Sequence, residues 1–170
     1  AEIQEGISFE KIEDLGRSEI GNNEIERITD LKLKDEQRET IHSVLSHKGS
    51  ATIAALPTGY GKTLISQACT LALREIGPTL VISPLISLMQ DQVNQMNAIG
   101  VKSMFFQSNS QKFSINQQMD NARFGKFKLI YCSPERLLNA DFISQLKLLP
   151  LNGIAVDEAH CISEWGHDFR

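Results

Sequence analysis

Short apolar runs alternate along this chain with longer segments in which apolar side chains recur every three or four residues. The short runs have the length of buried strands, and the longer segments have the period of amphipathic helices. The runs predict strands at residues 52–56, 79–83, 101–106, 127–132 and 153–156. The longer segments predict helices at residues 36–47, 62–75, 86–99, 111–124 and 139–148.

The predicted strands are apolar at successive positions, so both of their faces are expected to be buried. Such strands, alternating with helices, are typical of a parallel sheet covered by helices on both sides. The sequence therefore predicts an α/β domain. Polar segments follow four of the strands, and ligands of such sheets bind at the carboxyl ends of the strands. The functional site is expected at this edge.

Residues 1–30 differ from the remainder, because they have weak periodicity and carry nine acids but only three bases. We interpret them as a peripheral N-terminal segment or linker, with a short helix that Asn23 caps together with Glu26. Residues 31–170 are expected to form the domain.

The bulk composition narrows the class of protein. With 170 residues, 41% hydrophobic and 22% charged, the chain is typical of one globular domain. Its net charge of −4 neither indicates nor excludes a nucleic-acid partner. No apolar run has the length of a membrane span, and no signal-peptide profile is present, so no membrane partner is expected. Three widely spaced cysteines indicate a reducing compartment, the cytoplasm with its nucleoid in bacteria or the nucleus in eukaryotes.

A glycine-rich turn that ends in Gly61-Lys62-Thr63 lies between the first predicted strand and a helix. Backbone N–H groups of such a turn bind phosphates, the Lys neutralises the outer phosphates, and the Thr hydroxyl binds Mg²⁺. Leu56 stands where the strict pattern has Gly, so the alternative is an ordinary strand-to-helix turn. The expected nucleotide-binding residues of the turn are Thr58, Gly59, Tyr60, Gly61, Lys62 and Thr63.

The last predicted strand ends in an acid pair, Asp157-Glu158, followed by Ala159-His160. We expect Asp157 to hold the metal and Glu158 to orient the attacking water. His160 is expected to couple the nucleotide site to its surroundings. Lys62, Asp157 and Glu158 are thus the candidate catalytic residues, with Thr63 and Asp157 as metal ligands. The alternative is a capped strand end.

Other polar positions suit nucleic acid. Hydroxyls and helix N-terminal N–H groups at Ser83, Pro84, Ser133 and Arg136 suit a phosphate backbone, although Ser-Pro is also a common helix start. The loop around Trp165 suits contacts to bases, unless the ring closes the edge of the core. Its expected contact residues are Trp165, His167, Phe169 and Arg170.

A glutamine amide has a paired donor and acceptor that match the edge of adenine. Gln37 is the candidate for this role, and its alternative is a solvated helix start.

Four segments together resemble the RecQ family of superfamily 2 DNA helicases. They read LPTGYGKT from Leu56, VISPLISLMQDQV from Val81, SPERL from Ser133 and DEAHCISEWGHDFR from Asp157. The last is the most specific, because its continuation after the acids is similar to the aromatic-rich loop of that family. The resemblance covers residues 31–170.

The resemblance implies an ATP- and Mg²⁺-dependent motor that unwinds DNA from 3′ to 5′, acting on single strands and duplex junctions in repair and recombination. The chain is similar to the N-terminal part of the first of two RecA-like domains, a P-loop NTPase fold truncated at its C-terminal side. The second domain with its arginine finger is expected outside this chain, which alone is expected to be nearly inactive. Gln37 falls on the adenine-reading glutamine of the family, and Lys34 stands where the family usually has Arg.

Two other classes of function stay open. One is a nucleotide-gated binding module within a larger assembly, for which the acidic N-terminal segment is suited. The other is an RNA-directed translocase, against which the Trp165 loop argues.

Overall fold

The computed structural model describes residues 16–46, 52, 54–56, 61–73, 77–107 and 114–159, without the side chains of 16–20. The four strands in this part of the chain are β1 (Thr79–Ile82), β2 (Ser103–Phe105), β3 (Leu129–Cys132) and β4 (Gly153–Val156). Its helices are α1 (Gly16–Thr29), α2 (Asp35–Ser46), α3 (Lys62–Ala72), α4 (Ile86–Ala98), α5 (Ile115–Phe124), α6 (Ala140–Leu146) and the 3₁₀ helix η1 (Pro134–Leu138).

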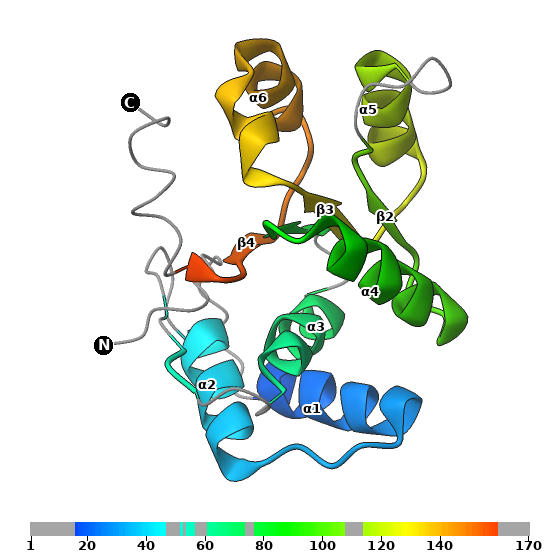
Figure 1. Ribbon diagram of the computed structural model, residues 1–170. Helices are drawn as coiled ribbons and strands as arrows, with labels where there is room; N and C mark the ends of the chain where they lie inside the picture. The colour runs from blue at the N-terminus through cyan, green and yellow to red at the C-terminus, as the bar shows by residue number, and fades with distance from the viewer. Residues whose placement is uncertain are drawn as a thin grey trace.

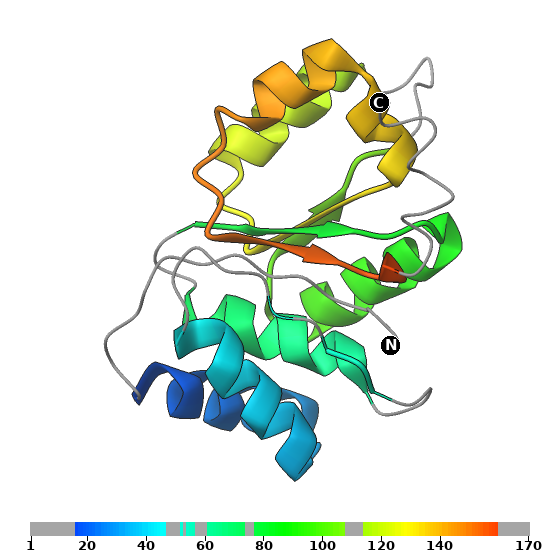
Figure 2. The ribbon, with the colours of Figure 1, turned by 90° about the vertical axis from the view of Figure 1, so that its left-hand side faces the viewer.

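The strands form one parallel sheet in the order β2-β3-β1-β4, with helices on both faces (Figures 1 and 2). Successive side chains of a strand point to opposite faces. Val81 and Tyr131 accordingly pack into the core with α3 and α4, and Leu80 and Ile130 pack into the core with α5 and α6. The predicted parallel α/β fold is confirmed. Each face of the sheet forms an apolar core together with the helices that cover it.

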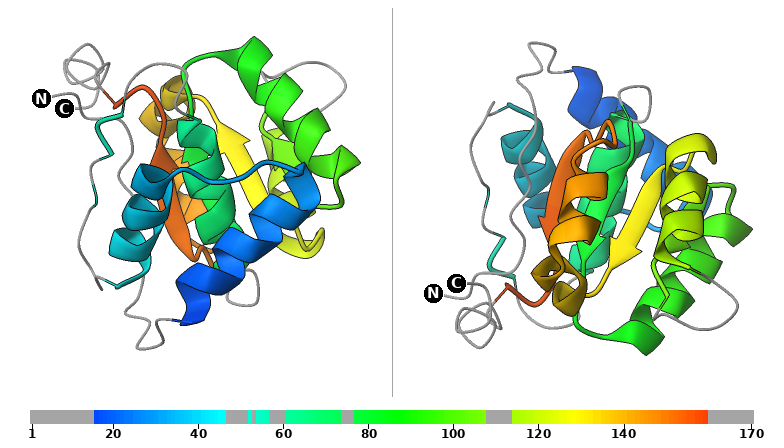
Figure 3. Two further views of the ribbon diagram at one scale, coloured as in Figure 1. Left: turned by 90° about the horizontal axis from the view of Figure 1, so that it is seen from below. Right: turned by 90° about the horizontal axis from the view of Figure 1, so that it is seen from above.

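Helices α1 and α2 form a further layer on α3, on the side away from the sheet (Figure 1; Figure 3, left). Ile25 of α1 and Ile41 of α2 are fully buried in the core that α3 shares with the sheet. Gly21 allows the close approach of α1, because a Cβ there would lie 2.5 Å from the carbonyl oxygen of Ala68.

The expected short helix capped at Asn23 is wrong. Helix α1 already begins at Gly16 and continues through Gly21 and Asn22, which are both buried. The glycine and asparagine looked like a linker because both residues favour turns in isolated sequence. Here the glycine instead serves helix packing. The division of the chain at residue 30 stays a prediction.

The predicted strand at residues 52–56 is absent from the described positions of that segment, Thr52 and Ala54 to Leu56, which have no regular structure. Ala54 is nevertheless buried in the core. An apolar run predicts burial, whereas a strand also requires a hydrogen-bonded neighbour. The remaining predicted elements are present: β4 has the predicted bounds, α2 begins and ends one residue earlier than predicted, and the others are shorter. Helix α5 begins at Ile115 because Ser114 and Gln117 form a capping box.

A buried hydrogen-bond network joins the end of α3 to the amino ends of β1 and β4. The Thr70 hydroxyl donates to Thr79 Oγ1 over 2.8 Å, and the Thr79 hydroxyl donates to Asn152 Oδ1 over 2.6 Å. Asn152 Nδ2 donates to the carbonyl oxygens of Gly77 at 2.7 Å and Leu73 at 3.3 Å. The network stabilises the end of the sheet at which the strands begin, opposite their carboxyl ends.

We predict that Asn152→Ala lowers the free energy of unfolding by about 1–3 kcal/mol, because it leaves buried polar groups without partners. Denaturant unfolding of the variant and wild type measures the difference. Asn94→Ala, at an exposed position of α4, is the matched control and should change stability by less than about 0.5 kcal/mol. Equal effects of the two substitutions would show that the network contributes nothing specific.

Candidate functional site

Three strands end at the same level of the sheet. The next residues are Ser83 after β1, Ser133 after β3 and Asp157 after β4. Hydrogen bonds hold this level: the Ser83 N–H donates to the carbonyl oxygen of Cys132 over 3.0 Å, and the Asp157 N–H donates to that of Ile82 over 2.8 Å. The polar segments that follow these strands therefore meet at one edge, as the sequence predicted.

Helix α3 points its amino terminus toward this edge. Gly61 has a φ of 74° and caps the helix without a side chain, and Lys62 and Thr63 form its first residues. The first-turn N–H groups of a helix lack intrahelical partners, and the helix dipole makes this end positive. The geometry suits an anion such as a phosphate group.

Gln37 joins α2 to the turn before α3. Its side chain is buried; Oε1 accepts from the Lys34 N–H over 2.7 Å, and Nε2 donates to the Gly61 carbonyl oxygen over 3.0 Å. A Cβ on Gly61 would lie 2.7 Å from Gln37 Nε2, so this contact requires glycine. The alternative, in which Gln37 lies in a solvent-exposed helix start, is wrong. Its amide is buried and connects Lys34 to Gly61 by hydrogen bonds.

Asp157 has an unusual electrostatic environment. Burial raises the pKa of its carboxyl, and the neighbouring Glu158 raises it further. The Glu158 N–H, the Lys62 ammonium and the Ser83 hydroxyl act in the opposite direction. The hydroxyl acts at longer range, because Ser83 Oγ makes no hydrogen bond of ordinary geometry within the described residues. The effect of Lys62 on Asp157 shows that the start of α3 and the end of β4 converge.

Glu158 has a left-handed backbone with a φ of 54°, and its N–H donates to Asp157 Oδ1 over 3.0 Å. This conformation is unfavourable for a residue with a side chain and is common at functional sites.

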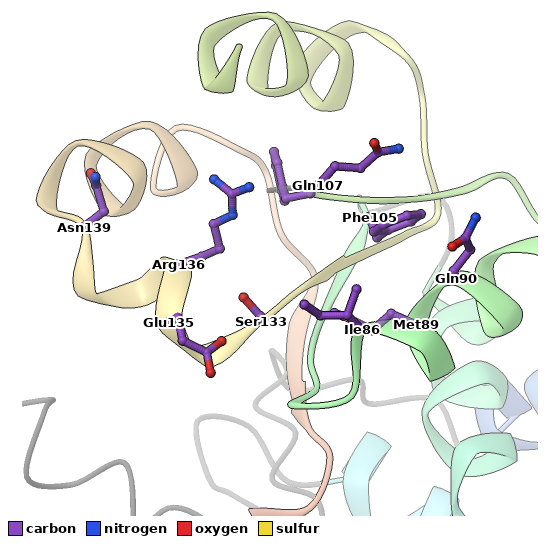
Figure 4. A pocket seen from close by; sticks show the side chains of 10 residues that line it. Ile86, Met89, Gln90, Phe105, Gln107, Ser133, Glu135, Arg136 and Asn139 are labelled. Carbon is purple, nitrogen blue, oxygen red and sulfur yellow. The ribbon is translucent and has the colours of Figure 1, made fainter. Parts of the chain in front are cut away.

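A cavity of about 600 Å³ lies beside this site, at the carboxyl ends of β2 and β3 (Figure 4). It is lined by Ile86, Met89, Gln90, Phe105, Phe106, Gln107, Ser133, Glu135, Arg136 and Asn139. Of these, only Ser133 and Arg136 were singled out from the sequence. Gln107 is a polar residue just after a predicted strand, which is the signal that could have found it.

Arg136 reaches into the cavity from η1 (Figure 4). Its Nη2 is buried and has no hydrogen-bond partner in the described part of the chain, and burial lowers its pKa. Burial also raises the pKa of the nearby Cys132 thiol to about 12, against the opposing effect of Arg136. That thiol therefore stays protonated and unreactive.

Residues 34–170 match the DEAD/DEAH box helicase family. The chain belongs to this family. The match includes both the start of α3 and the acid pair after β4, the two parts of the site that the fold brings together.

Several curated helicases are similar to this DEAD/DEAH box chain, and the resemblance to RecQ helicases is confirmed. The ATP-dependent DNA helicase RecQ of Pasteurella multocida (strain Pm70) is 46% identical over 135 residues, 79% of this chain and 21% of that protein. RecQ of Bacillus subtilis (strain 168) is 40% identical over 139 residues, 82% of this chain and 23% of that protein. The chain spans about a fifth of the length of these relatives.

Mouse WRN, a bifunctional 3′-5′ exonuclease/ATP-dependent helicase, is 42% identical over 139 residues, 81% of this chain and 9% of that protein. Similarity thus extends to bacterial and animal helicases.

The remaining predicted site residues lie outside the described ranges. They are Thr58, Gly59, Tyr60, His160, Trp165, His167, Phe169 and Arg170. Where side chains are described, no group of three or more His, Cys, Asp or Glu has the arrangement of a metal site, and no helix has the length and apolar character needed to cross a membrane.

We predict that Asp157→Asn raises the melting temperature above that of wild type at about pH 8 without nucleotide or divalent cations. The folded-state pKa of Asp157 is raised, so wild type loses stability as the pH rises through that pKa. The neutral amide avoids this loss, and its advantage should disappear as the pH falls through the same pKa. Thermal denaturation across a pH series measures this.

Asp91→Asn, at an exposed position of α4, is the control and should show no comparable gain. A variant of Asp157 that is less stable than wild type at every pH would show that Lys62 stabilises the carboxylate by more than burial destabilises it.

Proposed function

We propose that this chain is the ATP-binding part of a DNA helicase motor, which couples ATP hydrolysis to 3′-to-5′ translocation and unwinding. The observation that carries the proposal is the convergence of Lys62 and Asp157 at the carboxyl edge of the sheet. The membership in the DEAD/DEAH box helicase family and the similarity to proteins named ATP-dependent DNA helicases support it.

In this proposal the triphosphate lies at the amino terminus of α3. Residues 58–61 surround it with backbone N–H groups, and the Lys62 ammonium neutralises its outer phosphates. The Gln37 amide reads the adenine edge, and Lys34 lies beside it. The described contacts of Gln37 give it a second task, because it also holds the carbonyl group of Gly61.

The Thr63 hydroxyl and the Asp157 carboxylate are the proposed ligands of Mg²⁺. Oxygen ligands of these kinds suit that ion. The raised pKa of Asp157 fits this role, because a buried carboxylate gains from a cation beside it. When bound, the ion neutralises charge on the phosphates. Glu158 accepts the proton of the attacking water and orients it.

The proposed DNA partner, a single strand or a duplex junction, lies along the same edge. Ser83, Pro84, Ser133 and Arg136 contact its backbone. The segment from His160 to Arg170, with Trp165, His167 and Phe169, couples these contacts to the nucleotide site. A second RecA-like domain completes the motor, and DNA repair and recombination in the bacterial nucleoid or the nucleus are its proposed setting.

We predict that Lys62→Ala in the full-length protein abolishes DNA-stimulated ATP hydrolysis, with a loss of at least about a hundredfold, because the variant lacks the cation at the outer phosphates. Unwinding of a duplex with a 3′ single-stranded tail should disappear with it. Phosphate release and strand separation measure the two activities.

Lys147→Ala, at an exposed position just after α6, is the control and should retain both activities. Hydrolysis by Lys62→Ala at the wild-type rate would refute the nucleotide site. A nucleotide-gated binding module would give a different result. Single-stranded DNA would stimulate ATP hydrolysis by wild type, but duplexes with a 3′ tail or a 5′ tail would not be unwound.

We predict that Glu158→Gln retains ATP binding but loses turnover, because the amide keeps the shape of the side chain and cannot accept the proton. Titration with a fluorescent ATP analogue and steady-state phosphate release separate the two steps. If binding were lost while hydrolysis remained, the roles of Asp157 and Glu158 would have to be exchanged.

A further inference from the structure

The cavity between α4, η1 and the end of β2 is not part of the nucleotide site. Its volume of about 600 Å³ is in the range of small-molecule and cofactor sites. It shares one residue, Ser133, with the level at which β1, β3 and β4 end. Ser133 and Arg136 of its lining are also proposed contacts of the DNA backbone, so a ligand in the cavity would lie on the proposed DNA path.

The cavity has two chemically different walls (Figure 4). Ile86, Met89 and Phe105 form an apolar wall that includes a flat aromatic ring. Arg136 and Asn139 stand on the opposite side. A ligand that fills both sides needs a flat apolar part and a charged part.

Arg136 specifies the charged part. A guanidinium is always ionised, and a guanidinium nitrogen that is shielded from water and has no partner gains a hydrogen bond when an anion binds it. Arg136 Nη2 is in this state within the described residues. The adjacent acid does not relieve it, because the Glu135 carboxylate points away from the guanidinium (Figure 4). A phosphate group forms strong charge-assisted hydrogen bonds with arginine.

Two amides complete the lining, Gln90 from α4 and Gln107 from the chain after β2. Both residues are exposed, so their side chains can adjust to a ligand. Glutamine amides pair with the donors and acceptors at base edges. An aromatic wall, amides and a cation together match the ring, the edge and the phosphate of a nucleotide.

We propose that this cavity holds one nucleotide of a DNA single strand, with its base turned out of the stack against Ile86, Met89 and Phe105 and its phosphate on Arg136. The inference rests on the proposed function and extends it, because it assigns a base-binding site to a path otherwise described by backbone contacts. The protein then holds a fixed register on the strand at this nucleotide.

The test uses a single-stranded oligonucleotide labelled at one end and a series in which one abasic position moves along it. Fluorescence anisotropy measures binding of each strand to the protein. For wild type we expect one abasic position to weaken binding by about tenfold, because stacking of one base contributes about that much. The other positions should have little effect.

Ile86→Ala and Gln90→Ala should each weaken binding of the intact strand and remove the sensitivity to the abasic position. Ile86 is 60% exposed, so its substitution should leave the fold intact, as a melting curve verifies. Leu88→Ala and Gln95→Ala are matched controls, since both residues are exposed on α4 and neither lines the cavity. They should behave as wild type.

The outcomes separate the two proposals. The base site is overturned if the protein binds the strand but no abasic position weakens binding more than the others. It is also overturned if the cavity variants bind the strand as tightly as their control variants. Either result leaves the proposed DNA-binding function unaffected. Absence of strand binding by wild type overturns the proposed function and the base site with it. If a free deoxynucleoside monophosphate displaced the labelled strand as effectively as the unlabelled strand does, the cavity would be a site for free nucleotides. This result would overturn its assignment to a DNA strand.

Discussion

The parallel pairing of β1 with β3 and β4 is the constraint on which the site depends. In a parallel ladder each strand starts and ends in a fixed register with its neighbours, so residues that follow the strands share one level. Ser83, Ser133 and Asp157 meet for this reason and not because of any contact between their side chains. The network of Thr70, Thr79 and Asn152 fixes the same sheet at its opposite edge.

The functional edge concentrates features that are unfavourable for folding. Asp157 carries a raised pKa, Glu158 has a left-handed backbone, and a nitrogen of Arg136 is buried without a partner among the described residues. Each costs free energy in the protein alone, and the two apolar cores stabilise the fold against them. A phosphate or a cation relieves such costs on binding. The same features therefore make the edge a site for charged ligands.

The strand order separates two chemistries along this edge. β4, with the acid pair, is at one side of the sheet, and β2, beside the cavity, is at the other. β1 and β3 lie between them and carry Ser83 and Ser133 at their ends. In the proposed motor, a change at the acid pair would reach the strand-binding side across these two central strands. The distance between nucleotide and DNA contacts is thus a property of the strand order.

The amino-acid sequence by itself determined the class of fold, the bounds of β4, and which residues follow each strand. These features depend on side-chain periodicity and on turn residues close together in the chain, which a local pattern records. The four motifs that begin at Leu56, Val81, Ser133 and Asp157 were equally local, and together they sufficed to identify the helicase family.

Only the tertiary structure decided the strand order and the packing of Gly21 against Ala68. It decided as well that the described positions of residues 52–56 do not form the expected strand. It also decided that the Gln37 amide reaches Gly61, and that Phe105 and Gln107 share a cavity with Arg136. Each of these depends on groups far apart in the chain, whose meeting is set by which surfaces pack and which strands find a hydrogen-bonding neighbour. A residue's own sequence context carries no record of such partners.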